Sequence, residues 1–282
     1  MVVEVVERLQ TLESPAMTPL EEVASHVETL LDTVPDAHIQ AARDSLGTHL
    51  GPWTPIASIR RDLGLQLLQV ELRHATPVLE RLVPHMVDER IAGRILDLLA
   101  PAWVDLCAAR WLADCALRVG EKPVAVVNAS SRFAAEMYVR KASAKPPRTA
   151  WPLVSLVQVY GETPLEEMVS EIKRALIQEF RLETDPFEDD LDQRLEDLLT
   201  LRDDLGKPVF VVMRFDASAW KRLYQLQLAL PRITFLVLSG DDFPETVEPT
   251  ESAVCLIEPK LQPGDELDAK TDWNFARSVI GN

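Results

Sequence analysis

The sequence predicts an α/β fold in which a helical N-terminal region precedes a mostly parallel, five-stranded sheet with helices on both faces. Up to about residue 118, apolar residues recur at helical spacing. Beyond about residue 120, short apolar runs alternate with helix-like segments. Such runs are typical of strands buried on both faces, which form a parallel sheet covered by helices. We therefore predict two domains, a helical interaction region over residues 1–118 and an α/β domain over residues 119–282.

The first region is expected to consist of short helices separated by prolines. Thr18 is predicted to cap the first helix, with Pro19 at its first position and Glu21 completing the capping box. The apolar residues that mark the helices lie within Leu20–Leu31, Leu63–Leu72, Ile91–Leu99 and Val104–Leu117. Breaks are expected at Pro35, Gly51-Pro52, Pro77, Pro84 and Pro101.

Five apolar runs in the second region predict the strands. They cover residues 123–129, 151–160, 209–215, 233–238 and 253–257. Helices are expected between them at about residues 132–142, 163–182, 191–199 and 217–230. Thr163, Pro164 and Glu166 form a capping box that begins the second of these helices. The alternation of strand and helix favours a parallel sheet.

Charge and hydropathy exclude several classes of protein. The chain of 282 residues has a formal net charge of −16 at pH 7, which repels phosphate backbones and anionic lipids. We therefore expect neither a nucleic-acid partner nor a membrane partner. No apolar stretch reaches the length of about 18 residues that a membrane-spanning helix needs, and residues 1–8 lack the features of a signal peptide. These observations predict a cytoplasmic protein.

Cysteine and histidine indicate neither a metal site nor a nucleophile. Cys107, Cys115 and Cys255 are an odd number without metal-ligand spacing, so we expect reduced, buried thiols. All five histidines lie in the first 85 residues, and none pairs with another at the spacing of a helical metal site. They are expected at surface or interface positions. No Gly-x-Ser-x-Gly elbow occurs. The sequence therefore predicts no cofactor, no metal and no enzymatic activity.

Two strand ends in the second region resemble functional positions of the P-loop ATPases, in particular of their signalling STAND branch. The run 209–215 is followed by Asp216, as in a Walker B strand. The run 233–238 is followed by Ser239 and Asp241, at the position of a sensor residue. Asp216 is also explained as the cap of the following helix, and Asp241 as part of a solvated turn.

The phosphate loop of such a core is degenerate in this chain. A Walker A loop needs glycines whose backbone N–H groups wrap the phosphates, together with a Lys and a Ser or Thr. The corresponding segment contains Asn128, Ser130, Ser131 and Arg132 but no glycine, and Glu136 adds negative charge. Because Cβ atoms throughout this segment obstruct the approach of phosphates, we expect no bound nucleotide.

The order of elements over roughly residues 100–260 is similar to that of inactive STAND modules of bacterial conflict and immunity systems. This resemblance implies a non-catalytic signalling adaptor, scaffold or sensor component that contacts other protein components, such as a protease effector. Residues 260–282 are too short for the winged-helix arm of full STAND proteins. The alternatives are an active NTP-binding switch or ATPase with an atypical phosphate loop, and an obligate subunit without separable activity. The sequence sets no oligomeric state.

Other clusters have two explanations each. Ten acids between Glu183 and Asp204 form either a solvated face or a docking surface for a basic partner. A basic island either binds a phosphate-bearing ligand or offsets the acidic surface; it consists of Arg140, Lys141, Lys145 and Arg148. Three tryptophans are either interface anchors or core residues, namely Trp53, Trp103 and Trp111.

Overall fold

The computed structural model confirms the predicted α/β fold, with a helical region before a five-stranded sheet. The residues that it describes are 19–47, 58–118, 120, 122–143, 151–155, 164–182, 191–214, 220–240 and 254–280. The chain divides into two compact units, one of residues 1–99 with 276–282 and one of residues 100–275. We call them the helical unit and the α/β unit, and describe each by itself.

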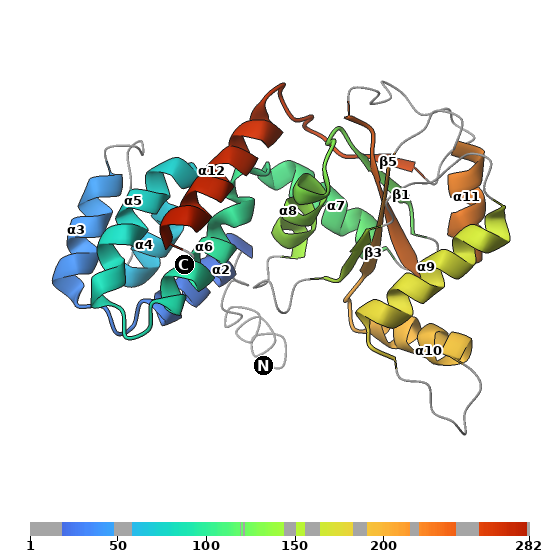
Figure 1. Cartoon of the computed structure of the whole chain (residues 1–282), viewed down its shortest axis with the longest axis horizontal. Helices are drawn as coiled ribbons and strands as arrows, with labels where there is room; N and C mark the ends of the chain where they lie inside the picture. Colours follow the sequence, from blue (N-terminus) through green and yellow to red (C-terminus); the bar gives the residue numbers. More distant parts are fainter. Residues whose placement is uncertain are drawn as a thin grey trace, which may run out of the picture. The chain divides into compact units, whose positions relative to one another are not determined.

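The helical unit is built around one short helix that is buried on all sides. Its elements are α2 (Pro19–Leu30), α3 (Asp36–Leu46), α4 (Ile59–Leu67), α5 (Leu72–Leu82), the 3-10 turn η1 (Val83–His85) and α6 (Arg90–Leu99) (Figure 1). In α4, all residues from Asp62 to Leu67 are buried. Gly64 allows α2 to lie close to α4, because a Cβ atom at this position would be 3.1 Å from the carbonyl oxygen of Ala24.

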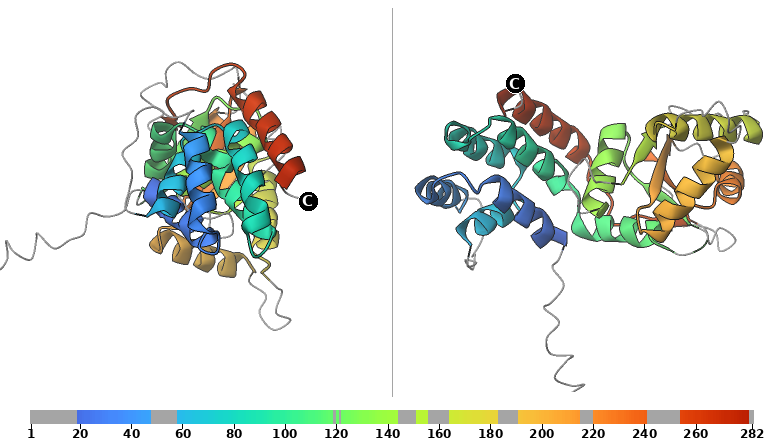
Figure 2. Two further views of the ribbon diagram at one scale, coloured as in Figure 1. Left: turned by 90° about the vertical axis from the view of Figure 1, so that its left-hand side faces the viewer. Right: turned by 90° about the horizontal axis from the view of Figure 1, so that it is seen from below.

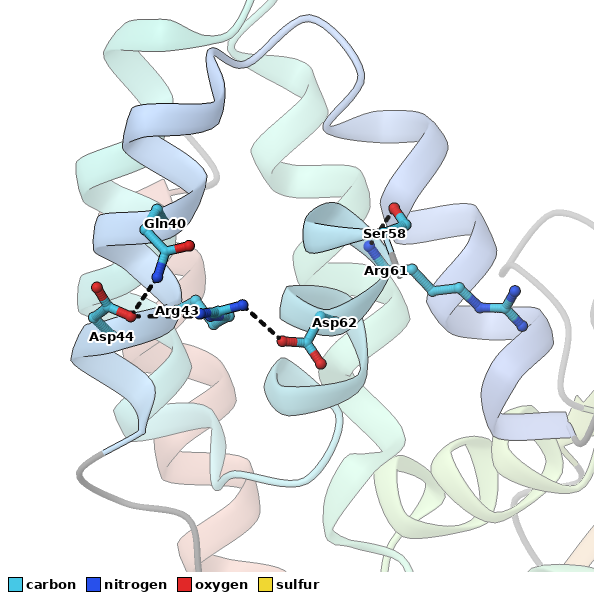
Figure 3. A network of polar contacts seen from close by, with 6 residues as sticks. All are labelled: Gln40, Arg43, Asp44, Ser58, Arg61 and Asp62. Carbon is cyan, nitrogen blue, oxygen red and sulfur yellow. Dashed lines mark hydrogen bonds and ion pairs between the residues drawn. The ribbon is translucent and has the colours of Figure 1, made fainter. Parts of the chain in front are cut away.

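The buried charge in α4 is balanced by α3, as Figure 3 shows. Asp62 is fully buried, and Nη1 of Arg43 donates to its Oδ2 over 3.3 Å. At the start of α4, the Ser58 hydroxyl accepts a hydrogen bond from the backbone N–H of Arg61. Because a buried carboxylate needs a partner, the contact between Arg43 and Asp62 holds α3 against α4.

Two predicted helix boundaries in this unit are wrong. The run 63–72 is not one helix, since α4 ends within it and Leu72 begins α5. Pro77 was expected to be a break but lies inside α5. A proline in a helix interior removes one hydrogen bond. Here the turn beyond it buries Leu79 and Leu82, and this burial outweighs the lost bond.

The α/β unit contains an all-parallel sheet with the strand order β2-β3-β4-β1-β5. The strands are β1 (Val124–Val127), β2 (Leu153–Ser155), β3 (Val209–Arg214), β4 (Ile233–Leu238) and β5 (Val254–Leu256). Each lies within a predicted apolar run. Residues 156–160, 215 and 253 of these runs lie outside the described residues.

Helices cover both faces of the sheet. They are the 3-10 turn η2 (Ala100–Trp103), α7 (Leu106–Ala116), α8 (Arg132–Ser143), α9 (Leu165–Glu179), α10 (Leu191–Asp204) and α11 (Trp220–Ala229). The last helix, α12 (Asp265–Ile280), follows the sheet in the chain, and its residues from Ala276 on belong to the helical unit. On one face, α7 and α8 pack against strand residues such as Ala125 and Phe210. On the other face, α9, α10 and α11 pack against residues such as Val126 and Val211 (Figure 2). Successive residues of a strand thus enter different cores, which explains why the runs are continuously apolar.

The first helix of the α/β unit lies before the predicted domain boundary. The compact units divide at residue 100, whereas the sequence predicts a boundary at residue 118. The reason is that α7 buries Ala109, Leu112 and Cys115 in the same core as α8. Helical periodicity identifies α7 correctly but carries no information on which core the helix joins.

Predictions on the cysteines and on one helix cap are wrong. Cys115 and Cys255 form a disulfide between α7 and β5, rather than two separate thiols. Cys107 is exposed, because it lies on the first turn of α7 at its solvent side. Pro164 occupies the cap position of α9, where it was expected to be the first helical residue. Thr18 and Thr163, predicted as caps, lie outside the described residues.

A buried lysine joins three elements at the start of β1. Lys122 is 1% exposed. Its ammonium donates to the carbonyl oxygen of Ala116 at the end of α7 over 2.7 Å and lies 2.6 Å from Oδ1 of Asp203 in α10. Its own carbonyl oxygen accepts a hydrogen bond from Gln227 of α11. A positive charge at a helix C-terminus also complements the helix dipole of α7.

We predict that Lys122→Met lowers the free energy of unfolding by about 2–4 kcal/mol, because it leaves the carbonyl oxygen of Ala116 and the carboxylate of Asp203 without their donor. Urea denaturation of both proteins measures the difference. The matched control is Lys173→Met, which removes a surface ion pair to Asp192 and should cost about 0–1 kcal/mol. Equal losses in the two variants would contradict the assigned role of Lys122.

Candidate functional site

The candidate site is a cavity at the carboxyl ends of β1 and β4. The connection after β1 leads through α8 on one face of the sheet, while the connections through α9, α10 and α11 use the other face. Parallel sheets bind ligands where the connections change direction in this way. The cavity has a volume of about 640 Å³. Its lining consists of Asn128, Ser130, Ser131, Gly240, Lys260, Leu261, Gln262, Pro263, Gly264, Glu266, Leu267 and Lys270.

Asn128 follows β1 directly and is committed to the backbone of a distant segment. Its Nδ2 donates to the carbonyl oxygen of Leu261 over 2.9 Å, and its Oδ1 accepts from the N–H of Leu261 over 2.8 Å. Both polar atoms of the amide are therefore used within the chain. These two hydrogen bonds hold the segment before α12 against the end of β1.

The predicted phosphate loop already holds a carboxylate from its own chain. The backbone N–H of Ser130 donates to Oε2 of Glu266 over 2.9 Å, and the hydroxyl of Ser130 donates to the same atom over 3.1 Å. Glu266 lies in the first turn of α12. A backbone N–H that would face a phosphate in an active loop thus faces a glutamate here.

The start of α8 is capped by a side chain. The hydroxyl of Ser131 accepts from the N–H of Ala134 over 3.2 Å, which satisfies one of the donors that a helix N-terminus would offer to an anion. Arg132 begins α8 and is exposed. Ser131 therefore has a structural role, and Arg132 lies at the surface beside the cavity rather than among its lining residues.

The predicted sensor position is also used within the sheet. Ser239 is 7% exposed, and its hydroxyl donates to the carbonyl oxygen of Val127 over 3.1 Å. The N–H of Gly240 donates to the carbonyl oxygen of Ala129 over 3.0 Å. These bonds fasten the end of β4 to the end of β1. Asp216 and Asp241 lie outside the described residues.

Negative charge gathers beside the cavity. Burial raises the pKa of the Tyr138 phenol, and the carboxylates of Asp105, Asp265 and Glu266 raise it further. These carboxylates disfavour a second anion at this place, so they disfavour the phenolate and a triphosphate alike. Lys260 and Lys270 are the basic residues of the lining.

Part of the predicted basic island is not a free cationic surface. Arg140 forms an ion pair with Glu136 one turn earlier on α8. Lys141 is partly buried, and burial lowers its pKa to about 8, although Asp105 acts in the opposite direction. Lys145 and Arg148 lie outside the described residues. Of the two described members of the island, Arg140 is therefore held in an ion pair and Lys141 is partly buried.

In the described part of the chain, the histidines and tryptophans do not gather at one site. His38 and His85 stack with ring centroids 3.5 Å apart. Within the described ranges, no group of three His, Cys, Asp or Glu side chains is arranged to hold a metal ion. Trp103 stacks against Phe133 in the α/β core, whereas Trp111 is 50% exposed. Trp53 and His49 lie outside the described residues.

Sequence reasoning missed the residues that close the cavity. Glu266 and Leu261 lie 136 and 133 residues from the groups that they bind. A local signal for α12 exists, because Gly264 precedes the acids Asp265 and Glu266 in its first turn. That signal predicts a helix but carries no information on what its first turn contacts.

Searches against protein-family models, curated proteins and solved structures find no match to this chain. Among the described helices, none combines the length and the apolar character needed to cross a bilayer.

The burial of Lys141 predicts a measurable pH dependence. With a pKa of about 8 in the folded state and 10.5 otherwise, the unfolded chain binds more protons between these values, so stability rises with pH there. We predict that Lys141→Met is more stable than the original chain at pH 7 by about 1–2 kcal/mol. The difference should shrink as the pH rises from 8 to 10. Thermal unfolding at several pH values measures it.

Lys270→Met, which removes an exposed lysine, is the control for the effect of the substitution itself. A Lys141→Met variant whose stability parallels that of the original chain from pH 7 to 10 would contradict the shifted pKa of Lys141.

Proposed function

We propose that this chain is a non-catalytic signalling adaptor, scaffold or sensor component of a bacterial defence system, acting through protein–protein contacts with a separate effector such as a protease. The observation that carries the proposal is the commitment of Asn128, Ser130 and Ser239 to partners within the chain. An α/β enzyme keeps such groups at the strand ends for its ligand. Here they stabilise the fold, which supports a role as a platform.

The resemblance to inactive STAND modules supplies the biological setting of the proposal. It rests on the order of strands and helices and on the glycine-free segment at residues 128–132. The charge of −16 favours protein partners over nucleic acid or anionic lipid. Together these features support an adaptor that binds other proteins of the same system and has neither a cofactor nor a metal.

An active NTP-binding switch is the second candidate, and one observation favours it. The cavity of about 640 Å³ has Lys260 and Lys270 in its lining, and cationic side chains suit phosphates. Against it stand the Cβ atoms of residues 128–132 and the carboxylate of Glu266, which obstruct the loop by size and by charge.

Nucleotide binding separates the two candidates. We predict that ATP with Mg²⁺ at millimolar concentration leaves the melting temperature of the chain unchanged. A ligand present at one hundred times its Kd would stabilise the protein by about 2.7 kcal/mol, which differential scanning fluorimetry detects as a shift of the melting temperature. A clear upward shift would rule out the non-catalytic proposal in its present form.

The variant Glu266→Ala refines this test. If side chains of residues 128–132 obstruct the loop, removal of the carboxylate alone leaves ATP unbound. A gain of ATP binding in Glu266→Ala would mean that the loop is competent and that Glu266 merely occupies it. The carboxylate of Glu266 would then be what prevents ATP binding in the original chain, and the NTP-binding switch would become the favoured candidate.

The proposal places the chain in the cytoplasm, where thiols are kept reduced. The structure brings Cys115 and Cys255 close enough to bond, and we predict that this bond forms only under oxidising conditions, so that both residues are thiols in living cells. Alkylation of acid-quenched cells followed by mass spectrometry should find all three cysteines modified. A blocked pair with only Cys107 modified would instead indicate an oxidising compartment, and Cys107 serves as the internal control because it is exposed.

A further inference from the structure

Three exposed leucines lie near the ends of α7 and α10. Leu201 and Leu205 are 56% and 57% exposed, and they lie one helical turn apart because the N–H of Leu205 donates to the carbonyl oxygen of Leu201. Leu117 is 47% exposed, and its Cδ2 would lie 3.9 Å from a Cβ atom on Gly206. We call Leu117, Leu201 and Leu205 the leucine strip.

The backbone below the strip is held in place. After α10, the N–H of Lys207 donates to the carbonyl oxygen of Arg202 over 2.8 Å, while Gly206 adopts a φ of +63°. This Schellman arrangement ends the helix in a defined way. The buried ammonium of Lys122 then links Asp203 of α10 to the end of α7. A preorganised apolar surface loses little entropy when a partner binds.

The surroundings of the strip are acidic. Helices α9 and α10 together contain nine acidic and four basic residues. Three acids of α10 are held in ion pairs, Asp192 with Lys173, Glu196 with Arg232 and Asp203 with Lys122.

Two further acids of α10 flank the strip. Asp197 and Asp204 are exposed, and they lie four residues before and three residues after Leu201, so they share its side of the helix. In the described part of the predicted acidic docking surface, these two carboxylates lie beside the leucines and form no ion pair with a described residue, although Asp197 also accepts a hydrogen bond from Gln193 on its own helix over 2.8 Å.

We propose that the leucine strip binds an amphipathic helix of a partner protein, one with apolar residues at i, i+4 spacing and Lys or Arg beside them. Apolar side chains would cover the leucines, and the basic residues would pair with Asp197 and Asp204. This inference rests on the adaptor function proposed above. A second copy of the chain would bring another charge of −16, and anionic lipid is repelled in the same way.

The chain contains a matched control surface. Tyr224 and Leu228 on α11 are 51% and 50% exposed and also lie one turn apart. Helix α11 has no acidic residue in its sequence WKRLYQLQLA. Exposure and spacing are thus the same as in the strip, but the acidic flank is missing. Hydrophobicity alone would make both surfaces bind, whereas the proposal requires only the leucine strip to do so.

The first experiment measures fluorescence anisotropy of two labelled Leu/Lys peptides of equal composition, one amphipathic and one scrambled. The full chain should bind the amphipathic peptide at least about tenfold more tightly than the scrambled one. The double variant Leu201→Ser, Leu205→Ser should lose this preference, and Tyr224→Ser, Leu228→Ser should keep it. Raising the salt concentration from about 0.1 M to 0.5 M should weaken binding. Equal loss in both double variants, or no preference, would overturn the proposal.

The second experiment places a photo-crosslinking amino acid at position 201 or, as control, at position 224, in cells of the source organism. Crosslinked peptides are identified by mass spectrometry, so the result does not depend on the stability of the serine variants. We expect position 201 to capture a segment that is basic and has apolar residues at helical spacing. Capture of an acidic or non-amphipathic segment, or equal capture at position 224, would contradict the proposed binding surface. It would leave the proposed adaptor function untouched. Absence of any captured protein at both positions, together with no partner for the original chain in pull-downs, would contradict the adaptor function itself.

Discussion

A single buried ammonium lies where the main parts of the α/β unit meet. Lys122 satisfies the carbonyl oxygen that ends α7, pairs with Asp203 at the end of α10 and accepts a bond from α11 through its own carbonyl. It lies two residues before β1, so this strand begins where contacts from three helices meet. Because a buried charge is tolerated only with good partners, the position of Lys122 constrains α7, α10 and α11 together. Lys122 lies at the edge of the sheet where β1 begins, and the candidate site lies at the opposite edge, where β1 ends.

At that opposite edge, the chain uses its own polar groups where an enzyme would place a ligand. Asn128 forms two bonds to the backbone of Leu261, and Ser130 donates twice to Glu266. The same contacts that occupy these donors also fasten the start of α12 to the α/β unit. Each donor that is bonded within the chain is unavailable to a phosphate.

The acidic residues of α10 fall into two groups. Asp192, Glu196 and Asp203 hold neighbouring elements through ion pairs, and Asp197 and Asp204 remain beside exposed leucines. A charge count over α10 alone does not separate these groups, because the basic partners come from α9, from the segment before β1 and from the start of β4. The proposed docking surface combines exposed leucines with carboxylates on the same side of one helix.

The sequence by itself determined the local structure of this protein. Continuous apolar runs predicted all five strands and their parallel arrangement, since a strand buried on both faces has no polar side. Only the tertiary structure decided which groups meet. Helical periodicity cannot show that α7 packs on α8, that Pro77 lies within a helix whose next turn is buried, or that Cys115 lies beside Cys255. Likewise the pairs Asn128 with Leu261 and Ser130 with Glu266 join residues more than 130 positions apart. Such contacts follow from the packing of whole elements, and no pattern of neighbouring residues encodes them.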